Sequence, residues 1–106
     1  MTFTVSSTIY IEAGIGSQTW GTASPAVDLT GYLTLKMNVS AMSSDRDGRD
    51  KLYISTTQSA NMAASVGANN TGVFSLDVSS YSGDYYIGLF TKNHGNFNVS
   101  KIWLEG

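Results

Sequence analysis

Short runs in which apolar and polar residues alternate are the main pattern of this chain. In the clearest run, Leu33, Leu35, Met37 and Val39 are separated by single polar residues. Because successive side chains of a β-strand point to opposite faces of a sheet, this spacing predicts a strand that is buried on one face only. Shorter runs of the same kind recur along the 106 residues, over 3–11, 52–57, 74–78, 85–90 and 97–104.

A five-residue phrase occurs twice, and each copy leads towards one of these runs. It reads Asp28-Leu29-Thr30-Gly31-Tyr32 and again Asp77-Val78-Ser79-Ser80-Tyr81. An Asp followed two positions later by a hydroxyl residue favours an Asx-type turn, in which the carboxylate accepts backbone N–H bonds. The aliphatic residue and the Tyr are then expected to point into the core. Both Asp residues are therefore assigned to turns that start strands, and not to catalysis.

Turn signals separate the alternating runs and make a single all-β domain over residues 1–106 the expected architecture. Residues 14–25 are expected to form a loop and residues 93–96 a hairpin-like turn. The alanine-rich segment 59–66 is the one place where a helical turn is expected. The parity of the apolar residues changes near Lys101, which predicts a β-bulge or a last strand buried on both sides. About six to eight short antiparallel strands of this kind favour a β-sandwich or barrel.

The composition excludes several classes of function. Absence of cysteine rules out a disulfide, a thiolate zinc site and a cysteine nucleophile. Six Lys and Arg residues and a net charge of −2 give no electrostatic footprint for nucleic acid. There is no apolar run of transmembrane length, so membrane insertion is not expected. The first residues lack the basic and apolar regions of a signal peptide, and the Ser-, Thr-, Gly- and Asn-rich composition is typical of all-β proteins of virions and secreted or cell-surface assemblies.

The stretch from Asp28 to Leu104 resembles the galactose-binding-like jelly roll of non-catalytic carbohydrate-binding modules, and the resemblance is carried by the segment FSLDVSSYSGDYYIG, residues 74–88. The closing run Val99–Glu105 is similar to the last strand of that family, and the stretch 28–35 is similar to small domains of phage and prophage tail-associated structural proteins. The resemblance implies an antiparallel β-sandwich of jelly-roll type. It assigns no binding residues, because the family binds through variable loops.

Trp20 is the best candidate for a ligand-stacking side chain, since it is a large aromatic residue among small polar ones. An indole offers a flat surface to the C–H face of a sugar, and neighbouring amide or hydroxyl groups can bond sugar hydroxyls. The alternative is that Trp20 folds back and closes one end of the sandwich; Trp103 is expected in the core. Two tyrosines are expected to face outward and line a sheet face, and the turn containing the single histidine offers further polar contacts. The candidate ligand-binding residues are Gln18, Trp20, Tyr53, Tyr86, Asn93, His94 and Asn96.

The segment Asp45-Arg46-Asp47-Gly48-Arg49-Asp50 is the one candidate metal site. Carboxylates spaced around a glycine are typical of calcium loops, so Asp45, Asp47 and Asp50 could hold a structural calcium ion. The alternative is a solvated hairpin loop in which the two arginines neutralise the carboxylates through weak ion pairs. No other cofactor is expected.

Enzymatic activity is not expected, because the chain has one histidine, no Gly-x-Ser-x-Gly motif and no pair of carboxylates suited to acid and base catalysis. The sequence therefore predicts a non-catalytic carbohydrate-binding module of a phage tail or cell-surface assembly. The alternative is a structural protein of a virion that binds other protein chains, including further copies of itself, and not sugar.

Overall fold

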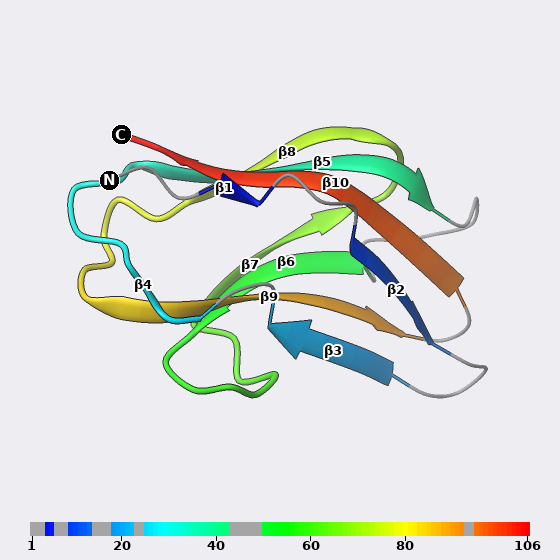
Figure 1. Ribbon diagram of the computed structural model, residues 1–106, viewed down its shortest axis with the longest axis horizontal. Helices are drawn as coiled ribbons and strands as arrows, with labels where there is room; N and C mark the ends of the chain where they lie inside the picture. The colour runs from blue at the N-terminus through cyan, green and yellow to red at the C-terminus, as the bar shows by residue number, and fades with distance from the viewer. Residues whose placement is uncertain (1–3, 6–8, 14–17, 23–24, 43–49, 93–94) are drawn as a thin grey trace.

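Two antiparallel β-sheets packed face to face form the molecule (Figure 1), as seen in a computed structural model that describes residues 4–5, 9–13, 18–22, 25–42, 50–92 and 95–106. Within these ranges no helix could span a membrane. The strands are β1 (Thr4–Val5), β2 (Ile9–Ala13), β3 (Gln18–Thr22), β4 (Val27–Asp28), β5 (Thr34–Met42), β6 (Asp50–Ser55), β7 (Ala64–Ala68), β8 (Gly72–Asp77), β9 (Asp84–Lys92) and β10 (Gly95–Glu105).

The strand order is that of a jelly roll, which confirms the predicted fold class. One sheet has the order β1-β10-β5-β8, and β2 also pairs with β10. The other has the order β3-β9-β6-β7, with β4 also pairing β9. Without the two-residue strands, β2-β10-β5-β8 faces β3-β9-β6-β7, so most consecutive strands lie in opposite sheets, as in double-sheet jelly rolls.

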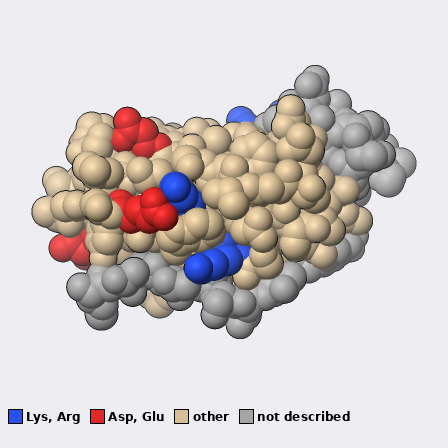
Figure 2. All heavy atoms as spheres, turned by 90° about the horizontal axis from the view of Figure 1, so that it is seen from above, with Lys and Arg blue, Asp and Glu red and all other residues tan. Residues whose placement is uncertain are grey.

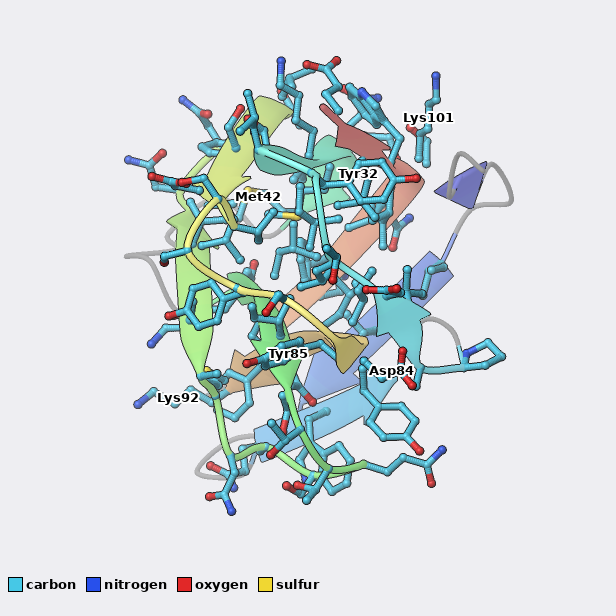
Figure 3. The ribbon with its side chains drawn as sticks, turned by 90° about the vertical axis from the view of Figure 1, so that its left-hand side faces the viewer. Tyr32, Met42, Asp84, Tyr85, Lys92 and Lys101 are labelled. Carbon is cyan, nitrogen blue, oxygen red and sulfur yellow. The ribbon has the colours of Figure 1, made fainter. Side chains whose placement is uncertain are left out.

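The core lies between the sheets and is built by the predicted alternation. Leu35, Met37 and Val39 of β5 are at most 1% exposed, whereas the residues between them are only partly buried. Leu33 departs from the prediction and is exposed, because it precedes the strand and its N–H is bonded to the carbonyl of Glu105. Figure 3 shows further apolar side chains between the two layers; Met42 and Tyr85 pack there against the core.

Both predicted Asx turns form. A carboxylate oxygen of Asp28 accepts the N–H of Thr30 at 3.0 Å, and one of Asp77 accepts the N–H of Ser79 at 2.9 Å. The aliphatic residues that follow, Leu29 and Val78, are fully buried, and Tyr32 and Tyr81 pack partly against the core. The two turns lie at the same end of the sandwich.

The parity change near Lys101 is a pair of β-bulges, as predicted. Val99 faces Val39 and Lys101 faces Asn38, so Ser100 is an extra residue on β10. One step earlier on the ladder, Ser40 is the extra residue on β5. The bulges keep the apolar residues of β10 on the core side both before and after the irregularity; these residues are Phe97, Val99, Ile102 and Leu104.

Three expectations about local structure are wrong. The segment 59–66 is not helical, because Ala64–Ala68 forms β7 and pairs with β6. The expected loop 14–25 contains β3. The segment 93–96 does not join a hairpin, since β9 ends at Lys92, β10 begins at Gly95, and the two strands belong to different sheets. The segment between β5 and β6, which carries Asp45 and Asp47, likewise joins opposite sheets.

Candidate functional site

Aromatic side chains gather on the outer face of the β3-β9-β6-β7 sheet, which we call the aromatic face. On β9, Ile87 and Leu89 belong to the core, so Tyr86, Gly88 and Phe90 point to the opposite side. Cross-strand partners share a face of the sheet. The register therefore adds Trp20, which faces Phe90, and Tyr53, which faces Gly88.

Tyr53 lies on this face but is fully buried, so the expectation that it is open to a ligand is corrected. The segment between β6 and β7 runs along the outside of the sheet (Figure 1), and the Tyr53 hydroxyl donates a hydrogen bond of 3.0 Å to the Ser59 carbonyl. Burial raises the pKa of the Tyr53 hydroxyl. The segment is held by its own hydroxyl groups: Ser55 accepts the N–H of Thr57, and Ser59 accepts the N–H of Asn61.

The Tyr53 ring lies directly over the backbone of Gly88. A Cβ atom placed on Gly88 would be 2.3 Å from Cζ of Tyr53, which is far inside van der Waals contact. The glycine thus creates the space in which the ring rests. Tyr53 is a supporting residue of the aromatic face and not a contact surface.

Trp20 is the exposed member of the cluster. It is 40% exposed and stands outside the core, so it does not close the end of the sandwich. Its neighbour Phe90 is only 7% exposed and faces Trp20 on one side and Lys51 on the other. Gln18 lies two residues before Trp20 on the same face and is exposed. Trp20 and Gln18 are thus brought together on the edge strand β3.

The remaining sugar-contact candidates are only partly brought to this face. Tyr86 is half-buried and faces Ser55 on β6. Asn96 is exposed but is the second residue of β10, in the other sheet, opposite Glu12 of β2. Asn93 and His94 lie outside the described residues. Sequence reasoning did not select Phe90 or Lys51, although the alternation of β9 already set Phe90 on the face opposite Ile87 and Leu89.

Asp50 is the one predicted calcium ligand within the described residues, and it is not exposed. It shares the parity of the core residues Leu52 and Ile54, is fully buried, and its carboxylate accepts a hydrogen bond of 2.5 Å from the Thr91 hydroxyl. Asp45 and Asp47 lie outside the described residues. Within the described part of the chain, no group of three or more acidic or histidine side chains could hold a metal ion. The role of Asp50 shown by the structure is to join β6 to β9.

The outer face of the other sheet carries a cluster of a different kind. Trp103 lies there half-buried, and not in the core as expected, with the Lys101 ammonium 4.8 Å from its ring centre. Its indole N–H donates to Glu105 at 2.9 Å, and Lys36 forms a 3.0 Å ion pair with the same carboxylate. These two contacts, first that of Trp103 and then that of Lys36, lower the pKa of Glu105. The polar groups around Trp103 are therefore engaged with one another.

Comparisons with protein-family models, with curated proteins and with solved structures each give no match for this chain.

Proposed function

We propose that this chain is a non-catalytic module that binds carbohydrate on its aromatic face. The observation that carries the proposal is the exposed indole of Trp20 beside Phe90 on the outside of a jelly-roll sheet. A pyranose ring presents an apolar C–H surface that stacks on an indole, and the amide of Gln18 can bond its hydroxyl groups.

The backbone that carries Trp20 is held by strand pairing, which favours binding. β3 is paired with β9 along its whole length, from Gln18 opposite Lys92 to Thr22 opposite Gly88. Beneath the face, Tyr53 is fixed between Gly88 and the segment that covers it. A backbone that is already ordered loses little conformational entropy when a ligand arrives.

The placement of acidic groups supports a binding role over hydrolysis. A glycosidase needs two carboxyl groups on either side of the scissile bond. Among the described side chains, the exposed carboxylates nearest along β9 are Asp84 and its cross-strand partner Asp28, six residues before Phe90. That distance is about 20 Å along an extended strand. The described part of the aromatic face around Trp20 therefore offers a surface for stacking and no acid–base pair.

Titration of carbohydrates against tryptophan fluorescence tests the proposal. In the variant Trp103→Phe the remaining indole is Trp20, so a change in emission reports on this residue alone. We expect Trp103→Phe to bind the glycans selected on an array as the native protein does. Trp20→Ala is expected to lose binding by about tenfold or more, as for an aromatic platform worth 1–2 kcal/mol. Failure to bind any polysaccharide, or full affinity in Trp20→Ala, would refute a carbohydrate site here.

A second candidate function, an assembly module that pairs with further copies of itself, is favoured by one feature. The chain has no charged residue or histidine between Lys51 and Asp77, and this tract contains β7 and β8, the strands at one edge of each sheet. Val73 on β8 is 56% exposed. Edge strands of monomeric proteins are commonly protected by lysine, proline or a bulge, and β8 has none of these between Gly72 and Leu76.

Measurement of molar mass in solution tests this second candidate. If copies pair through β8, the native chain is a dimer or larger and Val73→Lys shifts it to the monomer, because a lysine opposes edge pairing. Leu33→Lys, an equally exposed position outside the strands, is the matched control and should leave the assembly intact. A monomer at high protein concentration would count against the assembly function.

A further inference from the structure

Lys51 is a half-buried cation on the aromatic face, and no ion pair joins it to an acidic side chain of the described residues. The ion pair found among the described residues is that of Lys36 with Glu105, on the other sheet. The neighbouring Asp50 is turned to the core side, where its carboxylate accepts a bond from Thr91. A charged group that is partly removed from water gains most from an opposite charge close to it. Within the described residues, the Lys51 ammonium is therefore suited to hold the negative group of a ligand.

We propose that the carbohydrate bound on the aromatic face is acidic, with its negative group held by Lys51. This inference rests on the function proposed above and names the chemical class of the ligand. A lysine ammonium is a compact point charge that can pair with a carboxylate, a sulfate or a phosphate. The shared chemistry is thus a pyranose that carries one of these anions.

The geometry places the cation within reach of a stacked sugar. Lys51, Phe90 and Trp20 form one row across three neighbouring strands, β6, β9 and β3. Neighbouring strands are about 4.8 Å apart, so the outer two backbones are separated by about 10 Å. A ring stacked on Trp20 extends its substituents over Phe90, towards the ammonium at the end of the long Lys51 side chain.

The charge distribution of the described residues favours an anion at this place. The exposed carboxylates gather at the opposite end of the molecule, where the two Asx turns and the end of β10 lie; they are Asp28, Asp77, Asp84 and Glu105. Figure 2, which views the outer face of the β10-containing sheet, shows acidic atoms at one end and the lysines nearer the middle. On the aromatic face, Lys92 follows Phe90 by two residues and is exposed, whereas the nearby carboxylate of Asp50 is buried on the core side and bonded to Thr91.

Paired glycans that differ only in charge test the proposal. Uronate oligosaccharides are compared with their methyl esters, sulfated glycans with their desulfated forms, and phosphorylated glycans with their dephosphorylated forms. We expect one charged form to bind about tenfold or more tightly than its neutral partner, with an affinity that falls as salt is added. The pair that shows the preference identifies the anion.

Substitution of Lys51 then tests whether this side chain causes the preference for the charged glycan. Lys51→Gln should remove the advantage of the acidic form and leave the affinity for the neutral form unchanged, whereas Lys51→Arg should retain it. Lys36→Gln, on the other sheet, is the matched control and should bind as the native protein does. Thermal unfolding of each variant verifies that the fold is kept.

The outcomes separate this inference from the function on which it rests. Equal affinity for charged and neutral glycans, or an undiminished preference in Lys51→Gln, overturns the acidic ligand while the carbohydrate site stands. If no glycan of either kind binds and Trp20 emission does not change, the carbohydrate function itself is wrong, and the acidic ligand is rejected with it.

Discussion

Single side chains decide how the aromatic face is built. Gly88 has no Cβ, and this absence admits the ring of Tyr53, which in turn supports the segment that covers it through its bond to Ser59. Without the glycine, the ring and the backbone of β9 could not both keep their positions. The face that carries the exposed Trp20 and the buried Phe90 is therefore supported by a buried pair, Tyr53 and Gly88, that is not itself a contact surface.

Gly88→Ala should destabilise the fold through overpacking. The new methyl group would meet the Tyr53 ring, and inserting a methyl group into packed surroundings costs about 1–3 kcal/mol. Gly21→Ala on the adjacent strand β3 is the control, because nothing lies within 4 Å of its Cβ position, and we expect a change within about 0.5 kcal/mol. Urea unfolding measures both. Equal losses in the two variants would show that the contact with Tyr53 is not the cause.

The Asx turns predict a dependence of stability on pH. Hydrogen bonds from the Ser79 hydroxyl and N–H lower the pKa of Asp77 from its usual 3.8, and the corresponding groups of Thr30 lower that of Asp28. The unfolded chain thus takes up protons at a higher pH than the folded chain. The stabilisation from these carboxylates is fully present above about pH 4 and is lost as pH falls through the lowered values.

Asp77→Asn separates this charge effect from the turn itself. The amide oxygen of Asn can still accept the Ser79 N–H, but it does not titrate in this range. We expect Asp77→Asn to show a shallower loss of stability below pH 4 than the native protein, measured as the urea midpoint against pH. Asp77→Ala also loses the turn and should be less stable at neutral pH. An Asn variant whose acid curve matches the native one would contradict the role of this carboxylate.

At the scale of elements, strands with a regular apolar face were predictable, and strands without such a face, β3 and β7, were not. Buried and less buried residues alternate along β5, and the bulge of β10 is indicated by the shifted parity of its apolar residues. β3 gives no such signal, because its inner positions are Thr19 and Gly21 and its one large residue, Trp20, faces outward. The alanine-rich composition of β7 favours a helix, but pairing with β6 outweighs the helix propensity of alanine.

Deleting one residue of β10 tests which residue the bulge inserts. Without Ser100, Val99 and Lys101 become neighbours and face the consecutive residues Val39 and Asn38, so all apolar side chains of β10 keep facing the core. Without Asn98, alternation turns Val99 outward. We expect the Ser100 deletion to fold with the loss of its bond to Asn38, about 1 kcal/mol, and the Asn98 deletion to lose a further 1.5–3 kcal/mol of burial.

Thermal unfolding and proton NMR spectra distinguish these outcomes. The deletion of Ser100 should give a cooperative transition and dispersed methyl signals. If the two deletion variants are equally damaged, Ser100 is not a simple insertion in the strand.

At the scale of the whole molecule, the sequence predicts the fold class but not which strands meet. The turns at Asp28 and Asp77 depend on residues two positions apart, and alternation depends on near neighbours. Both can therefore be predicted from short stretches of the sequence. The crossing of the chain between sheets, such as that from β9 to β10, depends on packing between distant segments. The same holds for the site. Trp20 was identified from its type and neighbours, whereas its row with Phe90 and Lys51 follows from the register of three strands.

The pairing of the first strand with the last predicts that the chain can be circularly permuted. Thr4 lies opposite Trp103 and β1 runs antiparallel to β10, so the start of β1 lies beside the last residues of β10. A linker of about five glycine and serine residues can therefore join Gly106 to Met1 as a hairpin loop does.

Opened between Asn69 and Asn70, which are exposed between β7 and β8, the permutant should fold cooperatively. Opened between Tyr53 and Ile54, it should not fold, because the break divides a strand that pairs with both β7 and β9. Circular dichroism and thermal unfolding measure both permutants, and the reverse result would mean that the strand order does not govern folding in this way.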